Sequence, residues 1–163
     1  MTLRFLRNKV VEVEPRADGN LMVSWRLTDD LLKAEVGLII QIPELEIIKA
    51  EAWLERYPPY ACQEVLQRIK RAEGVCIGSG LRKILAGLLT GPDGSSLLLD
   101  AVLECCNAVI LHFTRPGIET GEAISDPEQK LAATRENIRN NPRLIRSCIA
   151  FQDDSPIMQG LNL

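Results

Sequence analysis

The sequence has few of the side chains that enzymes use for acid–base or nucleophilic chemistry. It contains a single histidine, His112, so catalytic arrangements that require two histidines are excluded. Its five cysteines are an odd number, which excludes a framework in which every cysteine is paired within the chain. No CxxC motif and no Cys/His cluster with zinc spacing occurs. We therefore predict no metal ion and no other cofactor.

Long apolar runs and an excess of positive charge are also missing. The purely aliphatic stretches reach only four or five residues, whereas a membrane span needs about 20. The 19 Lys and Arg residues against 22 Asp and Glu give a net charge of −3, which argues against a nucleic-acid partner. No apolar core follows the basic N-terminus, so we expect no signal peptide. These features predict a reduced, cytoplasmic protein of bacterial type without a membrane partner.

Four stretches in the first 57 residues have the alternation and the β-branched side chains of strands. They lie at 10–14, 21–27, 36–42 and 45–53. Short connections between them, including the Asp-Gly-Asn turn at 18–20, predict an antiparallel sheet with one solvated face. The alternation slips at Ile47 and Ile48, which indicates a β-bulge there.

From residue 61 onward the hydrophobic period changes to that of a helix. Helices are predicted at 61–70, at 81–89 and at 96–112, and the third is apolar almost all round, which is typical of a central, buried helix. The capping pattern Ser-Asp-Pro-Glu at 125–128 and the Asn-Pro pair at 141–142 predict two further helices, at 126–140 and 142–151.

The predicted fold class is α+β, with a three- or four-stranded antiparallel sheet, helices packed on one face and a C-terminal helical pair. We expect a core domain at 1–113 and a linker at 114–125, where Pro116, Gly117 and Gly121 occur. The helical pair at 126–151 packs on or beside the core in this interpretation, and residues 152–163 form a loose tail.

Cys62 is the strongest single candidate for a functional residue. It lies where a proline-rich segment leads into the first predicted helix, and the N–H groups and dipole of a helix N-terminus lower the pKa of a thiol. The functional interpretation of this position is a nucleophile or a metal ligand, and the alternative is a small buried side chain, since free cysteine is among the most buried residue types. Cys105 and Cys106 lie within the apolar third helix and point about 100° apart, so we expect both in the core.

Three other features have ordinary structural interpretations. The glycine-rich loop at 74–80 lacks Gly-Lys-Ser/Thr and follows a helix, so turn and cap formation explains it better than phosphate binding. His112 ends the third helix, where a structural or capping role is expected. Five basic residues against three acidic ones in the C-terminal helices indicate a solvated face, with a patch for an acidic partner as the alternative.

Several short motifs follow one another in a fixed order along the chain. They are RADG at 16–19, LTD at 27–29, PYAC at 59–62, LAG at 85–87 and GSSLL at 94–98. This order resembles that of an uncharacterised bacterial family, domain of unknown function 2889, over about Val10 to Phe113. The family has no established biochemical activity that the resemblance could imply for this chain.

Members of that family commonly have a His before the third strand, a Pro-x-x-Cys and a Gly-Cys-Thr-His-Leu string at the third helix. The resemblance implies a metal or reactive-thiol site formed by these groups. Here the first position falls near Lys33, and Ser95 and Leu97 replace the Cys and His of the string, so that only Cys62 remains. A weaker resemblance, in architecture, to iron–sulfur cluster scaffold proteins places Cys62 and Ser95 at the two comparable positions.

We expect Cys62, Ser95 and Lys33 to lie close together. The first helix begins where the fourth strand ends, the third strand begins at that same end, and the third helix can start there. The missing catalytic set favours a non-catalytic binding or assembly module, with self-association or a protein partner. The alternative is a thiol- or metal-dependent enzyme, or a sulfur- or cluster-handling protein, that uses Cys62.

Overall fold

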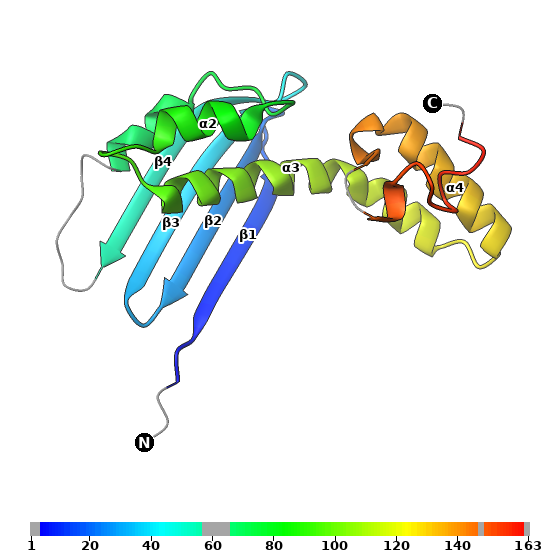
Figure 1. Ribbon diagram of the computed structural model, residues 1–163, viewed down its shortest axis with the longest axis horizontal. Helices are drawn as coiled ribbons and strands as arrows, with labels where there is room; N and C mark the ends of the chain where they lie inside the picture. Colours follow the sequence, from blue (N-terminus) through cyan, green and yellow to red (C-terminus); the bar gives the residue numbers. More distant parts are fainter. Residues whose placement is uncertain (1–3, 57–65, 147–148, 162–163) are drawn as a thin grey trace. The chain divides into compact units, whose positions relative to one another are not determined.

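The computed structural model describes residues 4–56, 66–146 and 149–161 (Figure 1). Four strands form one antiparallel sheet in the order β1-β2-β3-β4, which confirms the predicted α+β class. The strands are β1 (Arg7–Pro15), β2 (Leu21–Asp29), β3 (Leu32–Gln41) and β4 (Glu46–Arg56). The helices are η1 (Arg68–Ala72), α2 (Leu81–Leu89), α3 (Ser96–Glu122), α4 (Pro127–Asn140), η2 (Pro142–Leu144) and η3 (Ile149–Phe151).

The chain divides into two compact units. Unit 1 comprises residues 1–109 and contains the sheet, η1, α2 and the first half of α3. Unit 2 comprises residues 110–163 and contains the rest of α3, α4, η2 and η3.

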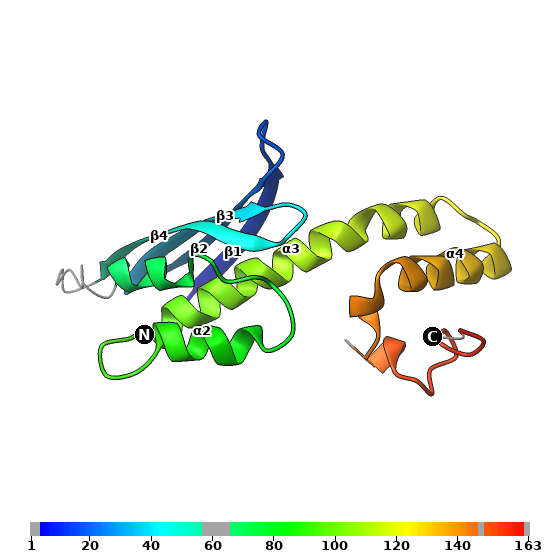
Figure 2. The same cartoon turned by 90° about the horizontal axis from the view of Figure 1, so that it is seen from above.

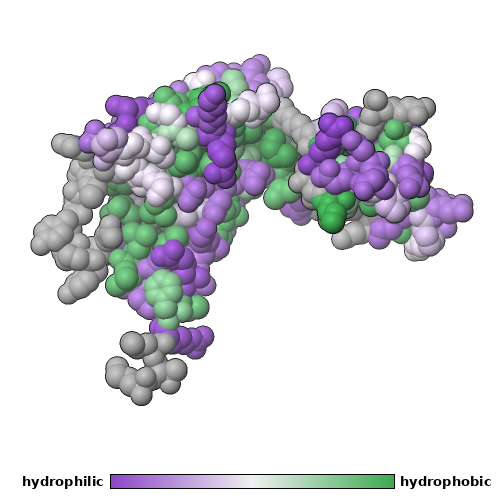
Figure 3. All heavy atoms as spheres, in the orientation of Figure 1, coloured by the Kyte–Doolittle hydropathy of each residue, from purple (hydrophilic) through white to green (hydrophobic). Residues whose placement is uncertain are grey.

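The sheet of unit 1 has one buried face and one solvated face, as the alternation predicts. On the buried face, every second residue of β2 from Leu21 to Leu27 and of β3 from Ala34 to Ile40 is at most 5% exposed. Both α2 and α3 lie on this face (Figures 1 and 2). Figure 3, which views the same face, shows hydrophobic residues over the strands next to α3.

The predicted bulge in β4 is present. Ile39 pairs with Lys49 and Ile40 pairs with Ile47, so Ile48 is the extra residue without a partner in the ladder. A single inserted residue exchanges the two faces of a strand. Beyond the bulge, Ala50 is therefore on the buried face, whereas Lys49, Glu51 and Trp53 are on the solvated one.

Helix α3 forms the centre of unit 1, and its two adjacent cysteines are in the core as predicted. Cys105 and Cys106 are 0% and 1% exposed. Next to them, Glu104 accepts a hydrogen bond from Trp25 Nε1 of β2. Its carboxylate also forms an ion pair with Lys9 Nζ of β1, 2.7 Å away. This carboxylate joins α3 to two strands of the sheet.

The start of α3 is set by Gly94 and Ser95. The Ser95 hydroxyl accepts a hydrogen bond from the Leu98 backbone N–H, which is the bond of an N-cap residue. Gly94 passes so close to the end of α2 that an added Cβ would lie 2.4 Å from the Leu89 carbonyl oxygen. Only glycine fits this connection between the two helices.

Part of the predicted linker is helical. Helix α3 continues to Glu122, so residues 114–122 of the predicted linker are helical, and the two units divide within the helix. The helix continues through a proline and two glycines, which lower helix propensity by about 3 and 1 kcal/mol each.

The C-terminal region differs from the predicted helical pair in its second half. Helix α4 begins where the capping pattern predicts, although its cap is Asp126 and not Ser125, and the described residues of 142–151 form only the short 3-10 helices η2 and η3. Arg146 has a positive φ of 60°, a left-handed conformation that interrupts a helix.

The described part of the C-terminal tail, residues 152–161, makes contacts within unit 2. Ser155 and Met158 are buried, and Arg135 of α4 donates hydrogen bonds to the Pro156 and Ile157 carbonyl oxygens. The composition of this segment does not reveal the hydrogen bonds from Arg135, because they go to backbone carbonyl groups.

Helix α3 also bears on the expected absence of a membrane span. Within the described residues, one stretch, Ser96–Arg115, is long and apolar enough to cross a membrane by length and composition alone. This stretch is apolar but not purely aliphatic, so the lengths of the aliphatic runs do not reveal it. In the structure its buried side chains, among them Val102 and Val109, belong to the core.

Candidate functional site

Lys33 and Ser95, two of the three residues that were expected to form a cluster, lie at the same end of the sheet but on different faces of it. Ser95 lines a small cavity together with Ala34 and Leu54, so α3 starts over the beginning of β3 and the end of β4, as the topology predicts. Lys33, however, is on the solvated face, because successive strand residues point to opposite faces and Ala34 is buried. Cys62 lies outside the described residues, so its part in such a cluster stays a prediction.

The two described members of the predicted cluster have structural partners. The Ser95 hydroxyl caps α3, and the Lys33 ammonium lies 3.9 Å from the Glu55 carboxylate of the neighbouring strand. The small cavity beside Ser95 has a volume of about 20 Å³, which is room for no more than about one water molecule. That cavity is too small for a substrate.

The three described cysteines, Cys76, Cys105 and Cys106, are not placed together as a metal-binding centre. Burial raises the pKa of Cys106 to about 12 and also raises the pKa of Cys105, so neither thiol ionises at neutral pH. Cys76 is exposed and pairs with Glu46 in an isolated bridge beside β4. Within the described ranges, no group of three or more His, Cys, Asp or Glu side chains is placed to hold a metal ion.

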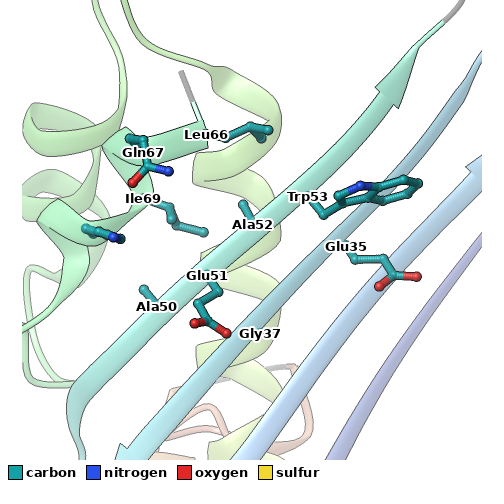
Figure 4. A pocket seen from close by; sticks show the side chains of 10 residues that line it. Glu35, Gly37, Ala50, Glu51, Ala52, Trp53, Leu66, Gln67 and Ile69 are labelled. Atoms are coloured by element: carbon teal, nitrogen blue, oxygen red, sulfur yellow. The ribbon is translucent and has the colours of Figure 1, made fainter. Parts of the chain in front are cut away.

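A groove of about 500 Å³ runs along the outer edge of β4, and the sequence analysis did not anticipate it (Figure 4). We call it the β4 groove. Strand β4 forms one side of it, and the segment from Leu66 to Lys70 forms the other. Its lining comprises Glu35, Gly37, Ala50, Glu51, Ala52, Trp53, Leu66, Gln67, Ile69 and Lys70.

The first half of the β4 edge is occupied by the chain itself. The Ile47 N–H donates to the Val75 carbonyl, and the Gly74 N–H donates to the Ile47 carbonyl. Farther along, the Ala50 N–H donates to the Glu73 carboxylate at 3.0 Å, away from β3. The sequence segment that follows η1 thus closes this edge as far as Ala50.

The second half of the edge carries backbone groups that point into the groove. In an antiparallel ladder the N–H and C=O groups of alternate residues point to the same side. Because the Ala50 N–H points away from β3, the backbone groups of Ala52 and Leu54 do so as well. Within the described part of the chain, these groups have no backbone partner on that side.

The groove is apolar toward the buried face of the sheet and polar toward the solvated face. Ala50 and Ala52 point toward the segment that carries Leu66 and Ile69, which gives an apolar side with small residues on β4 (Figure 4). On the solvated side, Trp53 is 49% exposed and lies next to its cross-strand partner Glu35. Gly37 adds no side chain there and leaves the space beside Glu51 open.

The solvated side of the groove is acidic. The hydrogen bond and charge of Lys49, 2.7 Å away, hold the pKa of Glu51 below its usual value, and Lys70 contributes at longer range. Glu35 makes no ion pair within the described residues, because the guanidinium of its neighbour Arg26 pairs with Glu12 instead. A carboxylate without a counter-ion therefore stands beside an exposed indole ring.

The signal for this site in the sequence is weak. The exposed position of Trp53 follows from the bulge at Ile48, which reverses the faces of β4. The groove itself requires residues from three separate segments to meet, and the edge position of β4 is a property of the whole sheet. The alternation within a single strand shows neither which segments meet at the groove nor that β4 is an edge strand.

The comparisons with known proteins identify a family but no activity. A family model described as "Protein of unknown function (DUF2889)" matches residues 31–110, within the range over which the motifs resemble that family. No curated protein and no solved structure matches the chain. The resemblance to iron–sulfur cluster scaffold proteins is not supported.

Proposed function

The chain belongs to the uncharacterised DUF2889 family through residues 31–110, and from this premise we propose that it is a non-catalytic binding module whose ligand docks in the β4 groove. Every residue that lines the groove falls within the matched region, so the groove is part of the family domain.

The observation that carries the proposal is a groove of about 500 Å³ with a half-exposed tryptophan at its rim. Ligand sites in proteins have volumes of about 300–1,000 Å³ and combine apolar walls with a few polar groups. Tryptophan is enriched at binding surfaces, because its ring buries a large area and its N–H can still reach a partner. The apolar side near Ile69 and the carboxylates near Trp53 provide both kinds of contact.

A fragment screen by NMR on the isotope-labelled chain tests the proposal. We expect bound fragments to shift the backbone signals of Ala50 to Trp53 and of Leu66 to Lys70. The substitution Trp53→Ala should weaken their binding by about 10-fold or more. Ile84→Ala in α2 is the matched control, since Ile84 is also 49% exposed and lies outside the groove.

Two results would contradict the proposal. Fragments that shift signals elsewhere in unit 1 but not along the groove would mean that the ligand site is in another place. Equal effects of Trp53→Ala and Ile84→Ala would mean that the groove residue has no special role. The alternative of a thiol-dependent activity through Cys62 stays a prediction and has its own test, given in the Discussion.

A further inference from the structure

We propose that the β4 groove binds an extended polypeptide segment, which pairs with β4 as a fifth strand and places basic side chains toward Glu35 and Trp53. The inference rests on the proposed function, because it names the class of ligand for the same groove.

The backbone of β4 supplies the first argument. The N–H and C=O groups of Ala52, in the groove, and of Leu54, just beyond its lining, point away from β3, and no other described backbone group pairs with them there. Such an edge is a template for an added strand, which then gains affinity from main-chain hydrogen bonds. The part of the edge that no described segment pairs with, from Ala52 to the end of β4 at Arg56, matches a strand of about five residues.

The two chemistries of the groove supply the second argument. Alternate side chains of an added strand point to opposite faces of the sheet. One set faces Ala52, Leu66 and Ile69, where apolar side chains fit beside small and aliphatic neighbours. The other set faces Trp53 and Glu35, where a lysine or arginine can stack on the indole ring and pair with the carboxylate.

Charge also selects among the segments that could occupy the edge. A second copy of β4 would present Glu51, Trp53 and Glu55 on its solvated face, and pairing about Trp53 would place Glu51 opposite Glu55 of the copy. Like charges in opposite positions destabilise a strand pair. A segment with a basic residue opposite Glu35 complements that carboxylate, which has no ion pair among the described residues, so we infer a basic, alternating partner rather than a second copy.

Peptides of about ten residues test the inference with the full chain. The probes are an alternating Val-Lys peptide, an alternating Val-Glu peptide, and the Val-Lys peptide with N-methyl groups on the residues that would donate to β4. We expect the first to bind about 10-fold or more tightly than the second, with an affinity that falls as salt is raised. N-methylation should abolish binding, because it removes the main-chain donors.

A charge reversal on the sheet gives the matched comparison. Glu35→Lys should weaken binding of the Val-Lys peptide by about 10-fold. Glu14→Lys makes the same change on β1, at the opposite edge of the solvated face, and should alter binding by less than about 2-fold. Hydrogen exchange at the Ala52 and Leu54 amides should slow when the Val-Lys peptide is bound.

Several results would overturn the inference. Equal binding of the two unmodified peptides, equal effects of the two charge reversals, or tight binding of the N-methylated peptide would each contradict strand addition by a basic segment. Slow exchange of the Ala52 and Leu54 amides without peptide would show that the chain itself or a second copy occupies the edge, and sedimentation would distinguish the two. If fragments bind in the groove but peptides do not, this inference fails and the proposed function stands.

Discussion

The two tryptophans show how strongly position controls the role of a residue in this protein. Trp25 on β2 is 1% exposed and donates its indole N–H to Glu104, whereas Trp53 on β4 is 49% exposed at the rim of the groove. Both lie in strands with similar alternation. The difference arises because the bulge at Ile48 turns Trp53 to the solvated face.

Substitutions at Cys105 test the assignment of the adjacent cysteines to the core. Cys105→Ser should lower the free energy of unfolding by about 1–3 kcal/mol, because it introduces a hydroxyl at a fully buried position. Cys105→Ala should cost less. Urea unfolding measures both, and Cys76→Ser, at an exposed site, is the control. Equal tolerance of Ser and Ala would contradict a buried position.

The close approach at Gly94 predicts an unusually specific requirement for glycine. Gly94→Ala places a methyl group against the Leu89 carbonyl oxygen and should destabilise unit 1 by about 1–3 kcal/mol. Gly87→Ala, in the middle of α2 with open space around it, should be neutral or stabilising by up to about 1 kcal/mol. Thermal unfolding of both variants checks the pair, and similar melting temperatures would disprove the steric argument.

The reactivity of Cys62 separates the binding interpretation from the thiol alternative. Alkylation rates for all cysteines can be measured in one sample, with exposed Cys76 and buried Cys105 and Cys106 as internal standards. A non-catalytic role predicts that Cys62 reacts no faster than Cys76. A rate far above that of Cys76 at neutral pH would indicate a thiol of lowered pKa and favour the alternative.

Helix α3 contacts the sheet through both apolar and polar side chains. Its buried side packs on the sheet, while its polar residue Glu104 reaches both Trp25 and Lys9. Burial by itself raises the pKa of Glu104, but the hydrogen bonds and charge of its partners outweigh burial and leave the pKa below its usual value. The ionised form therefore stabilises the fold.

The lowered pKa of Glu104 predicts that Glu104→Gln changes the free energy of unfolding by an amount that depends on pH. A carboxyl group with a lowered pKa in the folded state contributes stability above its ordinary pKa of about 4.3, and loses it as the pH falls through the lower folded value. At pH 7 the variant should be less stable by about 1–2 kcal/mol, since the pair is partly solvated. The difference should shrink below about pH 4.

Urea unfolding of the two proteins at neutral and acid pH measures this effect. Asp100→Asn, one turn earlier on α3 and exposed, is the control and should change stability by less than about 0.5 kcal/mol at either pH. A pH-independent difference for Glu104→Gln would mean that packing, and not charge, accounts for its contribution.

At the scale of the whole molecule, the family match and the compact units share one boundary. The match ends at residue 110, and unit 1 ends at residue 109, within α3. The match begins at residue 31, so β1 and β2 lie before it, although β2 supplies Trp25 and much of the buried face. The sheet is therefore completed by residues outside the matched region. A cytoplasmic location and self-association stay predictions.

The metal content of the purified protein is a prediction for the molecule as a whole. We expect no stoichiometric zinc and no iron–sulfur cluster, because Lys33, Ser95 and Leu97 stand where the resemblance implies ligands. Elemental analysis and the absorption spectrum measure both. One tightly bound ion per chain that is lost on Cys62→Ala would disprove this expectation.

The sequence by itself determined the features that depend on local pattern. The four strands, the bulge at Ile48, α2 and the presence of α4 all follow from periodicity or capping chemistry within a few residues. The burial of Cys105 and Cys106 follows as well, because a helix that is apolar almost all round must be covered on most sides.

Only the tertiary structure decided which groups meet and which surfaces stay open. Lys33 and Ser95 come to the same end of the sheet, yet the face of a strand residue depends on its register with neighbouring strands. The continuation of α3 through Pro116 and two glycines and the burial of Ser155 and Met158 in the tail are not evident from local preferences. The β4 groove arises because β4 is the last strand of the sheet and the segment from Leu66 to Lys70 lies beside it.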